Sequence, residues 1–302
     1  MKRVVGISLG SSDRDSTAEL EFLGHHFVVQ RIGTDGDEAR FQRLMQEYDG
    51  KVDALCFGGG DLYLVAAGRR YPLRSTQRLI RGVRQTPVLD GVGLKHALEA
   101  ATVSWLQNEG VVDFSSARVF LVCAVDRYGL AEALARVAKR MVIGDLMFGL
   151  GIGVPLTSLR QLNVVARLLL PIIARVPFEW LYPTGERQRV IVPKWTRYYQ
   201  WADVIAGDFL FIRRHMPERL EGKVILTNTT TPEDVGLLRE RGVRLLVTGT
   251  PRIGGRTFGT NILEGMLVAA ADGQGPLPAE EYLARLRQAG WQPTVERLQE
   301  SK

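Results

Sequence analysis

The chain has 302 residues, which at roughly 150 residues per domain predicts two domains. Hydrophobic residues make up 45% and charged residues 24%, as in globular proteins, so the composition excludes a disordered chain, a fibrous repeat and a small disulfide-rich domain. The net charge of +6 permits an anionic partner, but the basic residues are spread along the chain, and nucleic-acid binding is not favoured because it requires basic residues clustered on one face.

The cysteines and the apolar runs favour a cytoplasmic location. Cys56 and Cys123 each lie in an apolar run and are interpreted as small buried hydrophobes, without a disulfide or a metal. The N-terminal apolar stretch is short and is interpreted as a first strand rather than a signal peptide. The run 146–159 carries no charge, but it is too short and too rich in Gly to span a bilayer.

The first 90 residues predict a mixed α/β domain. Their apolar patterns predict a strand over 3–9, a hairpin over 19–32, a helix over 37–48, a strand over 52–57, a second hairpin over 62–73 and a helix that ends near 84. The turn Gly58–Asp61 follows the strand over 52–57, and Gly10 follows the first strand. Such glycine-rich turns expose backbone N–H groups to an anion or a polyol, although most are ordinary tight connections.

The rest of the chain predicts a second α/β domain. An inter-domain helix over 91–112 is followed by strands over 118–124, 141–144, 203–207, 223–227 and 243–248 that alternate with helical patterns. Continuous apolar strands of this kind indicate a parallel sheet with both faces covered. We therefore predict an α/β fold in which residues 1–90 form the mixed α/β domain, residues 113–275 form a doubly wound, Rossmann-like parallel sheet, and residues 276–302 form a helical tail.

One insertion, residues 146–202, does not fit this alternation of strands and helices. Arg160, Arg167 and Arg175 recur there every seven or eight residues, with apolar residues between them. A helix at the surface of a membrane has this appearance. We favour instead a packing helix, kinked at Pro171, that covers the sheet or a homodimer interface.

Polar residues follow several strands of the predicted second domain, where ligands bind in open α/β sheets. The candidate cofactor-binding residues are Ala124, Asp126, Arg127, Gly129, Asp145, Asn228, Thr229 and Thr248. The strand, turn and helix over 119–137 are the context of a dinucleotide site, in which Asp145 would hold a ribose hydroxyl. The glycines of such a turn are missing, however, and Asp126 would repel a phosphate. Each of these residues is also typical of a helix or turn cap.

The segment Asp90-Gly-Val-Gly-Leu94, the helix after it and the strand Arg118–Val122 resemble the shikimate/quinate dehydrogenase family, in particular quinate 5-dehydrogenase-like proteins. Members of that family have an Asn-Thr-Asp-Gly-x-Gly segment that leads into an inter-domain helix and then a Rossmann domain. The similarity continues through Ala202–Gly207 and Lys223–Pro232, and it covers residues 85–270.

The resemblance implies a dehydrogenase that transfers hydride between NAD or NADP and a ring hydroxyl of a polyhydroxy acid such as quinate or shikimate. Asp90 takes the place of the catalytic aspartate, and the family's catalytic lysine is absent from the matching region, so Lys95 is the candidate replacement. The candidate substrate-binding residues are Gly59, Gly60, Asp61, Gly91 and Gly93. No metal-ligand spacing is present in the sequence.

The same departures from the family pattern support an alternative, a non-redox binding or regulatory protein that keeps the Rossmann scaffold without the chemistry. On either hypothesis we expect a small-molecule ligand and a homodimer. A third hypothesis, a protein that binds a membrane surface, depends only on residues 146–181 and is not favoured.

Overall fold

The structure is a computed structural model that describes residues 1–176, 190–250, 252–253 and 256–299. The chain forms two compact units, each of which is described by itself. Unit 1 contains residues 1–97, 168–187 and 252–291, and unit 2 contains residues 98–167, 188–251 and 292–302. Two helices, α3 (Val92–Asn108) and α6 (Leu159–Ile173), continue from one unit into the other.

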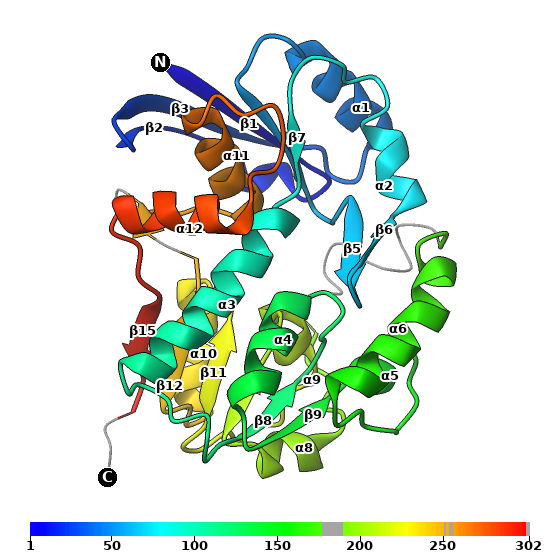
Figure 1. Ribbon diagram of the computed structural model, residues 1–302, viewed down its shortest axis with the longest axis vertical. Coiled ribbons are helices and arrows are strands. Elements are labelled where there is room, and N and C mark those ends of the chain that lie inside the picture. Colours follow the sequence, from blue (N-terminus) through cyan, green and yellow to red (C-terminus); the bar gives the residue numbers. More distant parts are fainter. Residues whose placement is uncertain (177–189, 251, 254–255, 300–302) are drawn as a thin grey trace. The chain divides into compact units, whose positions relative to one another are not determined.

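Unit 1 is built on a five-stranded sheet with the order β2-β3-β1-β4-β7 (Figure 1). Its strands are β1 (Lys2–Ser8), β2 (Ser16–Phe22), β3 (His25–Gly33), β4 (Ala54–Gly58) and β7 (Val88–Leu89). β1 pairs in parallel with β3 and β4, β4 pairs in parallel with β7, and β2 forms an antiparallel hairpin with β3. The remaining elements of this unit are η1 (Ser12–Arg14), α1 (Glu38–Tyr48), the hairpin β5 (Tyr63–Ala66) and β6 (Arg69–Pro72), α2 (Arg74–Leu79), the hairpin β13 (Arg252–Ile253) and β14 (Arg256–Thr257), α11 (Thr260–Ala270) and α12 (Ala279–Gln288).

The alternation of side chains along β1 places α1 and α11 on opposite faces of this sheet. Val5 and Ile7 belong to the same buried cluster as Phe41 and Met45 of α1. Gly6, between Val5 and Ile7, faces the other way, and a Cβ added to it would lie 2.4 Å from Ile262 of α11. Unit 1 is therefore a sheet covered on both sides.

α11 contacts the sheet without a gap because glycine faces it at the crossing. A Cβ added at Gly265 would lie 2.4 Å from Sγ of Cys56 and 3.0 Å from a methyl group of Val4. All of the α11 residues from Ile262 to Ala270 are buried. A helix that is apolar over most of its surface requires burial on most sides, which explains why it packs against this sheet.

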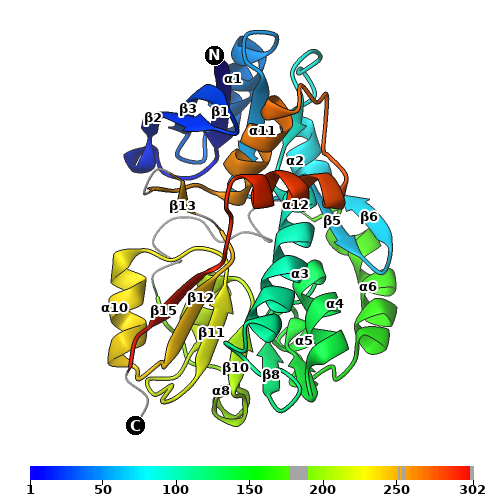
Figure 2. The same ribbon diagram turned by 60° about the vertical axis from the view of Figure 1, so that its left-hand side comes forward.

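Unit 2 is built on a six-stranded sheet with the order β15-β12-β11-β10-β8-β9. Its strands are β8 (Arg118–Leu121), β9 (Arg140–Ile143), β10 (Val204–Ala206), β11 (Val224–Thr227), β12 (Leu245–Thr248) and β15 (Thr294–Arg297). The first five are parallel, and β15 pairs antiparallel with β12, as Figure 2 shows. Its other helices are α4 (Tyr128–Val137), α5 (Asp145–Gly149), α8 (Thr196–Trp201), α9 (Phe209–His215) and α10 (Pro232–Glu240).

The α/β fold class with a doubly wound, Rossmann-like parallel sheet is thus confirmed, but the units do not follow the predicted boundaries. The predicted second domain, 113–275, included the helix over 261–270, which belongs to unit 1 as α11. The predicted helical tail, 276–302, contains α12 in unit 1 and then the strand β15 in unit 2. Sequence order does not reveal which sheet a late helix covers when both sheets offer an apolar face.

The insertion contains the predicted helix, α6, with Pro171 near its C-terminal end. Part of the predicted segment 146–181, residues 177–181, lies outside the described residues. Among the helices of the described chain, none is both long enough and apolar enough to cross a bilayer.

Candidate functional site

In each sheet, the connections of two neighbouring strands lead toward opposite edges of the sheet. Open α/β sheets bind ligands at this switch point, at the carboxyl ends of the two strands. In unit 1 it lies between β1 and β4, because β3 pairs on the other side of β1. In unit 2 it lies between β8 and β10, because β9 pairs on the other side of β8. The residues that follow these four strands therefore define two candidate sites.

In unit 2, Asp145 caps the turn that follows β8. Its carboxylate accepts hydrogen bonds from the N–H groups of Ala124, at 2.8 Å, and Val125, at 2.9 Å. Burial raises the pKa of Asp145 to about 6, and these hydrogen bonds oppose the rise. The sequence predicted that Asp145 would hold a ribose hydroxyl, but in the structure both of its oxygens are bound to the backbone of its own unit.

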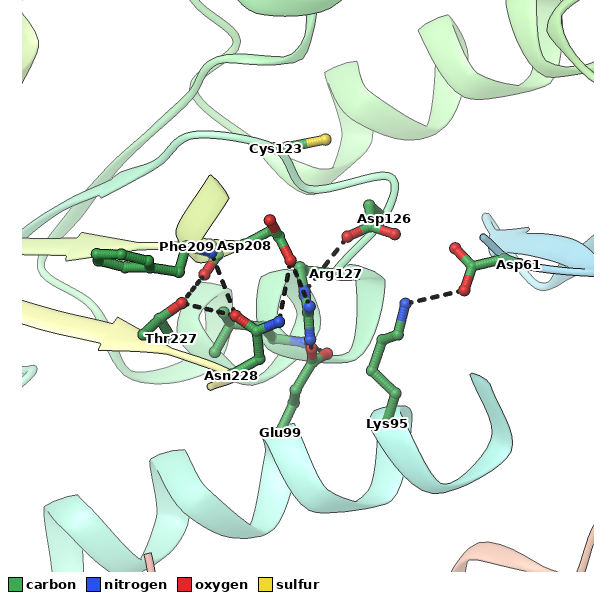
Figure 3. A network of polar contacts seen from close by, with 12 residues as sticks. Asp61, Lys95, Glu99, Cys123, Asp126, Arg127, Asp208, Phe209, Thr227 and Asn228 are labelled. Carbon is green, nitrogen blue, oxygen red and sulfur yellow. Dashed lines mark hydrogen bonds and ion pairs between the residues drawn. The ribbon is translucent and has the colours of Figure 1, made fainter. Parts of the chain in front are cut away.

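Arg127 occupies the same turn, surrounded by carboxylates (Figure 3). Only 8% of its side chain is exposed, and its guanidinium nitrogens lie 3.0 Å from Glu99, 2.9 Å from Asp208 and 3.3 Å from Asp126. A guanidinium with three carboxylate partners does not offer a free cation to an anionic ligand. Glu99 also accepts a hydrogen bond from the N–H of Leu130 in the first turn of α4.

The network extends to the end of β11, where Asn228 donates a hydrogen bond to Asp208 at 3.0 Å and accepts one from the N–H of Phe209. The structure thus brings together Arg127, Asp208 and Asn228, which are far apart in the sequence. Thr248 is buried at the end of β12, Gly129 is buried in α4, and Thr229 is partly exposed after β11.

This arrangement does not fit a dinucleotide. A phosphate bound at the turn after the first strand requires free backbone N–H groups and a positive local charge. Here Asp145 accepts the hydrogen bonds of Ala124 and Val125, and the carboxylates around Arg127 outnumber it. A bound phosphate would have to displace these contacts.

In unit 1, the turn after β4 presents backbone N–H groups. Gly59 has a φ of +94°, a conformation that favours glycine, and it is exposed. The N–H groups of Gly59 and Gly60 donate no hydrogen bond within the described part of the chain. Neighbouring groups in this turn are held firmly, since the N–H of Leu9 donates to the carbonyl of Gly58 and Asn261 donates to the carbonyl of Phe57.

Asp61 and Lys95, both predicted as site residues, lie together in unit 1. The Lys95 ammonium is 3.4 Å from a carboxylate oxygen of Asp61, and both side chains are 10% exposed (Figure 3). Asp61 is held in place at its backbone, because its carbonyl accepts a hydrogen bond from the hydroxyl of Thr76. Asp61 directly follows Gly59 and Gly60 in the sequence, so the buried ion pair and the glycine turn together define the candidate site of unit 1.

Asp90, the predicted catalytic aspartate, is buried next to this pair. Its two oxygens accept hydrogen bonds from the N–H groups of Leu62, at 2.7 Å, and Val92, at 3.1 Å. Burial raises the pKa of Asp90, whereas the positive charge of Lys95 lowers it. The carboxylate therefore fixes the entry of the β5 hairpin against the start of α3, and the catalytic role of Asp90 and Lys95 stays a prediction.

Glu264 of α11 organises the same region and was not among the site residues predicted from the sequence. Glu264 is 1% exposed and accepts hydrogen bonds from the N–H groups of Gly91, at 2.7 Å, and Leu94, at 3.2 Å, and from the hydroxyl of Tyr282, at 2.6 Å. A Cβ added at Gly93 would lie 2.6 Å from the Glu264 carboxylate. Gly91 and Gly93, predicted to bind substrate, therefore allow Glu264 to cap α3. The signal in the sequence was a lone acid in an otherwise apolar helix.

No group of His, Cys, Asp and Glu side chains in the described residues has an arrangement suited to a metal ion.

No curated protein matches the sequence. Among solved structures, a galactofuranose binding protein has a TM-score of 0.34 and 12% identity, with 96% of this chain and 100% of that chain covered. A periplasmic solute binding protein from Actinobacillus succinogenes 130z with bound D-allose has a TM-score of 0.37 and 10% identity, with coverages of 99% and 98%. A putative malic enzyme has a TM-score of 0.41 and 13% identity, with coverages of 96% and 77%. These TM-scores are too low for a functional conclusion.

Two family models divide the chain close to the predicted start of the inter-domain helix. Residues 3–90 match DUF8753 and residues 93–298 match DUF8754, each described as a domain of unknown function. The first match contains the Gly59 turn and Asp61, and the second contains Lys95, Glu264 and the whole Arg127 network. Because the DUF8754 match extends over more than half of the sequence, the chain belongs to the DUF8754 family.

Proposed function

We propose that the protein is a non-redox binding protein that takes a small hydroxylated anion, of the polyhydroxy acid class, at the Gly59 turn of unit 1. The observation that carries the proposal is the contrast between the two candidate sites. In unit 2 the groups that would bind a cofactor already have partners within the protein, because Asp145 accepts hydrogen bonds from the N–H groups of the turn and carboxylates surround the Arg127 guanidinium. In unit 1 the N–H groups of Gly59 and Gly60 remain available to a ligand.

The chemistry of the Gly59 turn supports this ligand class. The N–H groups of Gly59 and Gly60 and the ammonium of Lys95 are donors, which suit a carboxylate or another anionic group. The carboxylate of Asp61 is an acceptor, which suits a hydroxyl group. A ligand that carries an anionic group and a hydroxyl group would bind the donors and the Asp61 acceptor at the same time.

A second candidate is the NAD(P)-dependent dehydrogenase implied by the family resemblance. It is favoured by one observation, the presence of Asp61, Asp90 and Lys95 together in unit 1, with the pKa of Asp90 raised by burial. A raised carboxyl pKa beside a lysine is typical of acid/base sites as well as of structural pairs. The two candidates share the polyol site and differ in the cofactor.

Isothermal titration calorimetry separates them. The protein is titrated with quinate, shikimate and gluconate, and separately with NADH and NADPH. We expect a polyhydroxy acid to bind without either cofactor, and we expect Lys95→Met to weaken this binding by about tenfold or more, the scale of a lost charged hydrogen bond. Lys139→Met, at an exposed lysine of unit 2, is the matched control and should bind as the unchanged protein does.

Binding of NADH or NADPH at micromolar concentration, with turnover of quinate, would establish the dehydrogenase and refute the non-redox proposal. Asp126→Gly adds a test of the cofactor site, because it removes a carboxylate that would repel phosphate. Cofactor binding gained only in this variant would support the proposal that the unchanged turn excludes a dinucleotide. If none of the three acids binds, the polyhydroxy acid proposal is wrong.

A further inference from the structure

Exposed apolar side chains gather in one part of the sequence. Of the ten large hydrophobic residues that are exposed in the described chain, eight lie between residues 150 and 192. They are Leu150, Ile152, Val154, Val164, Leu168, Ile172, Val190 and Val192. Scattered exposed hydrophobes require no explanation, but exposed hydrophobes that line up on one side of an element mark an interaction surface.

Helix α6 carries apolar residues on two sides. Leu162, Ala166 and Leu170 recur at every fourth position and are buried. Val164, Leu168 and Ile172 recur with the same spacing on another side, and their exposed fractions are 54%, 68% and 64%. The first stripe anchors the helix in the protein, so the second is held facing outward.

Among the described residues of the insertion, the charged side chains have a single sign, whereas Glu179 and Glu186 lie outside the described residues. Residues 146–176 and 190–201 contain five basic residues and no acidic residue. All five are exposed, namely Arg160, Arg167, Arg175, Lys194 and Arg197. On α6, Arg160 and Arg167 lie beside the exposed apolar stripe. The insertion therefore supplies most of the net charge of +6.

We propose that the exposed face of α6 docks on an anionic lipid membrane surface. An interfacial helix buries an apolar stripe between the lipid headgroups while flanking Arg side chains extend to the phosphates. A second copy of the same face would bring like charges together, which disfavours a homodimer through this surface. The proposal uses no residue of the Gly59 turn and goes beyond the proposed ligand.

Vesicle flotation of the full chain tests the proposal. Vesicles of phosphatidylcholine alone are compared with vesicles of phosphatidylcholine and phosphatidylglycerol in equal amounts. We expect binding only to the anionic vesicles, and we expect added salt to weaken it. Arg160→Gln, Arg167→Gln and Arg175→Gln should each weaken the partition by about fivefold, and the triple variant by about a hundredfold. The matched control replaces three exposed arginines elsewhere, Arg40, Arg43 and Arg136, by Gln.

The apolar stripe is tested by Leu168→Glu, which should abolish flotation, against Leu210→Glu at an exposed leucine of α9, which should not. Circular dichroism and thermal unfolding establish that each variant is folded, as expected for exposed positions. Absence of binding to anionic vesicles, equal loss in the control variants, or a dimer that Leu168→Glu dissociates would each overturn the proposal.

Discussion

Glu264 gives the fold a dependence on pH whose sign follows from its burial. Its pKa rises from 4.5 to about 7, with burial as the largest cause. The folded protein therefore retains a proton on this carboxyl between pH 4.5 and about 7, where the unfolded chain releases it. At about 1.4 kcal/mol per pH unit, the stability contributed by Glu264 falls by about 3 kcal/mol as the pH rises through this range.

The variant Glu264→Gln cannot titrate, so this contribution disappears from it. Urea unfolding of both proteins at a series of pH values gives the difference between their free energies of unfolding. As the pH rises from 4.5 to about 7, we expect this difference in the free energy of unfolding to shift by about 3 kcal/mol in favour of the variant, whatever the difference is at low pH. Glu280→Gln, at an exposed residue of α12, is the control and should show no such shift. A constant difference, or a shift in favour of the unchanged protein, would refute the reasoning.

Three further substitutions test the contacts that shape the two sites. Gly91→Ala should lower the free energy of unfolding by about 2 kcal/mol or more, because φ of Gly91 is +93° and the new Cβ would lie 2.8 Å from a backbone nitrogen. Gly68→Ala is the control, because its new Cβ would meet no atom within 4 Å, and it should cost less in the same urea titration. Arg127→Met should lower the free energy of unfolding by about 3–5 kcal/mol, since it leaves the largely buried carboxylates of Glu99 and Asp208 without their cation, and an unchanged urea midpoint would contradict the proposed network. Thr231→Ala should cost about 1 kcal/mol in thermal unfolding, because it removes the cap of α10, and a full retention of stability would argue against that cap.

Local patterns predicted most of the elements of this fold. The first strand, the hairpin over 19–32, the helix over 37–48 and the alternation after residue 118 are present as β1, the β2–β3 hairpin, α1 and the strands and helices of unit 2. These elements depend on the spacing of apolar residues and on turn residues, both of which are visible within a short window.

The sites were harder to predict, because their geometry depends on contacts between distant residues. The position of Asp145 after a strand, about twenty residues beyond the turn, predicted a contact with a ribose. In the structure its partners are the N–H groups of Ala124 and Val125, which lie within hydrogen-bond distance of its carboxylate. The role of Glu264 depends on a contact with Gly91 across 173 positions. A sequence window contains no information on such contacts.

The late position of α11 has a consequence for synthesis on the ribosome. The strands of the unit 1 sheet are complete by residue 89, but α11, which covers one of its faces, begins at residue 260. At roughly 10 residues per second, translation of the intervening segment takes about 17 s. During this interval Val4, Ala54 and Cys56 lack the helix that buries them. We therefore expect the nascent chain to depend on a chaperone that recognises apolar strands, and a chain truncated before α11 should aggregate rather than fold.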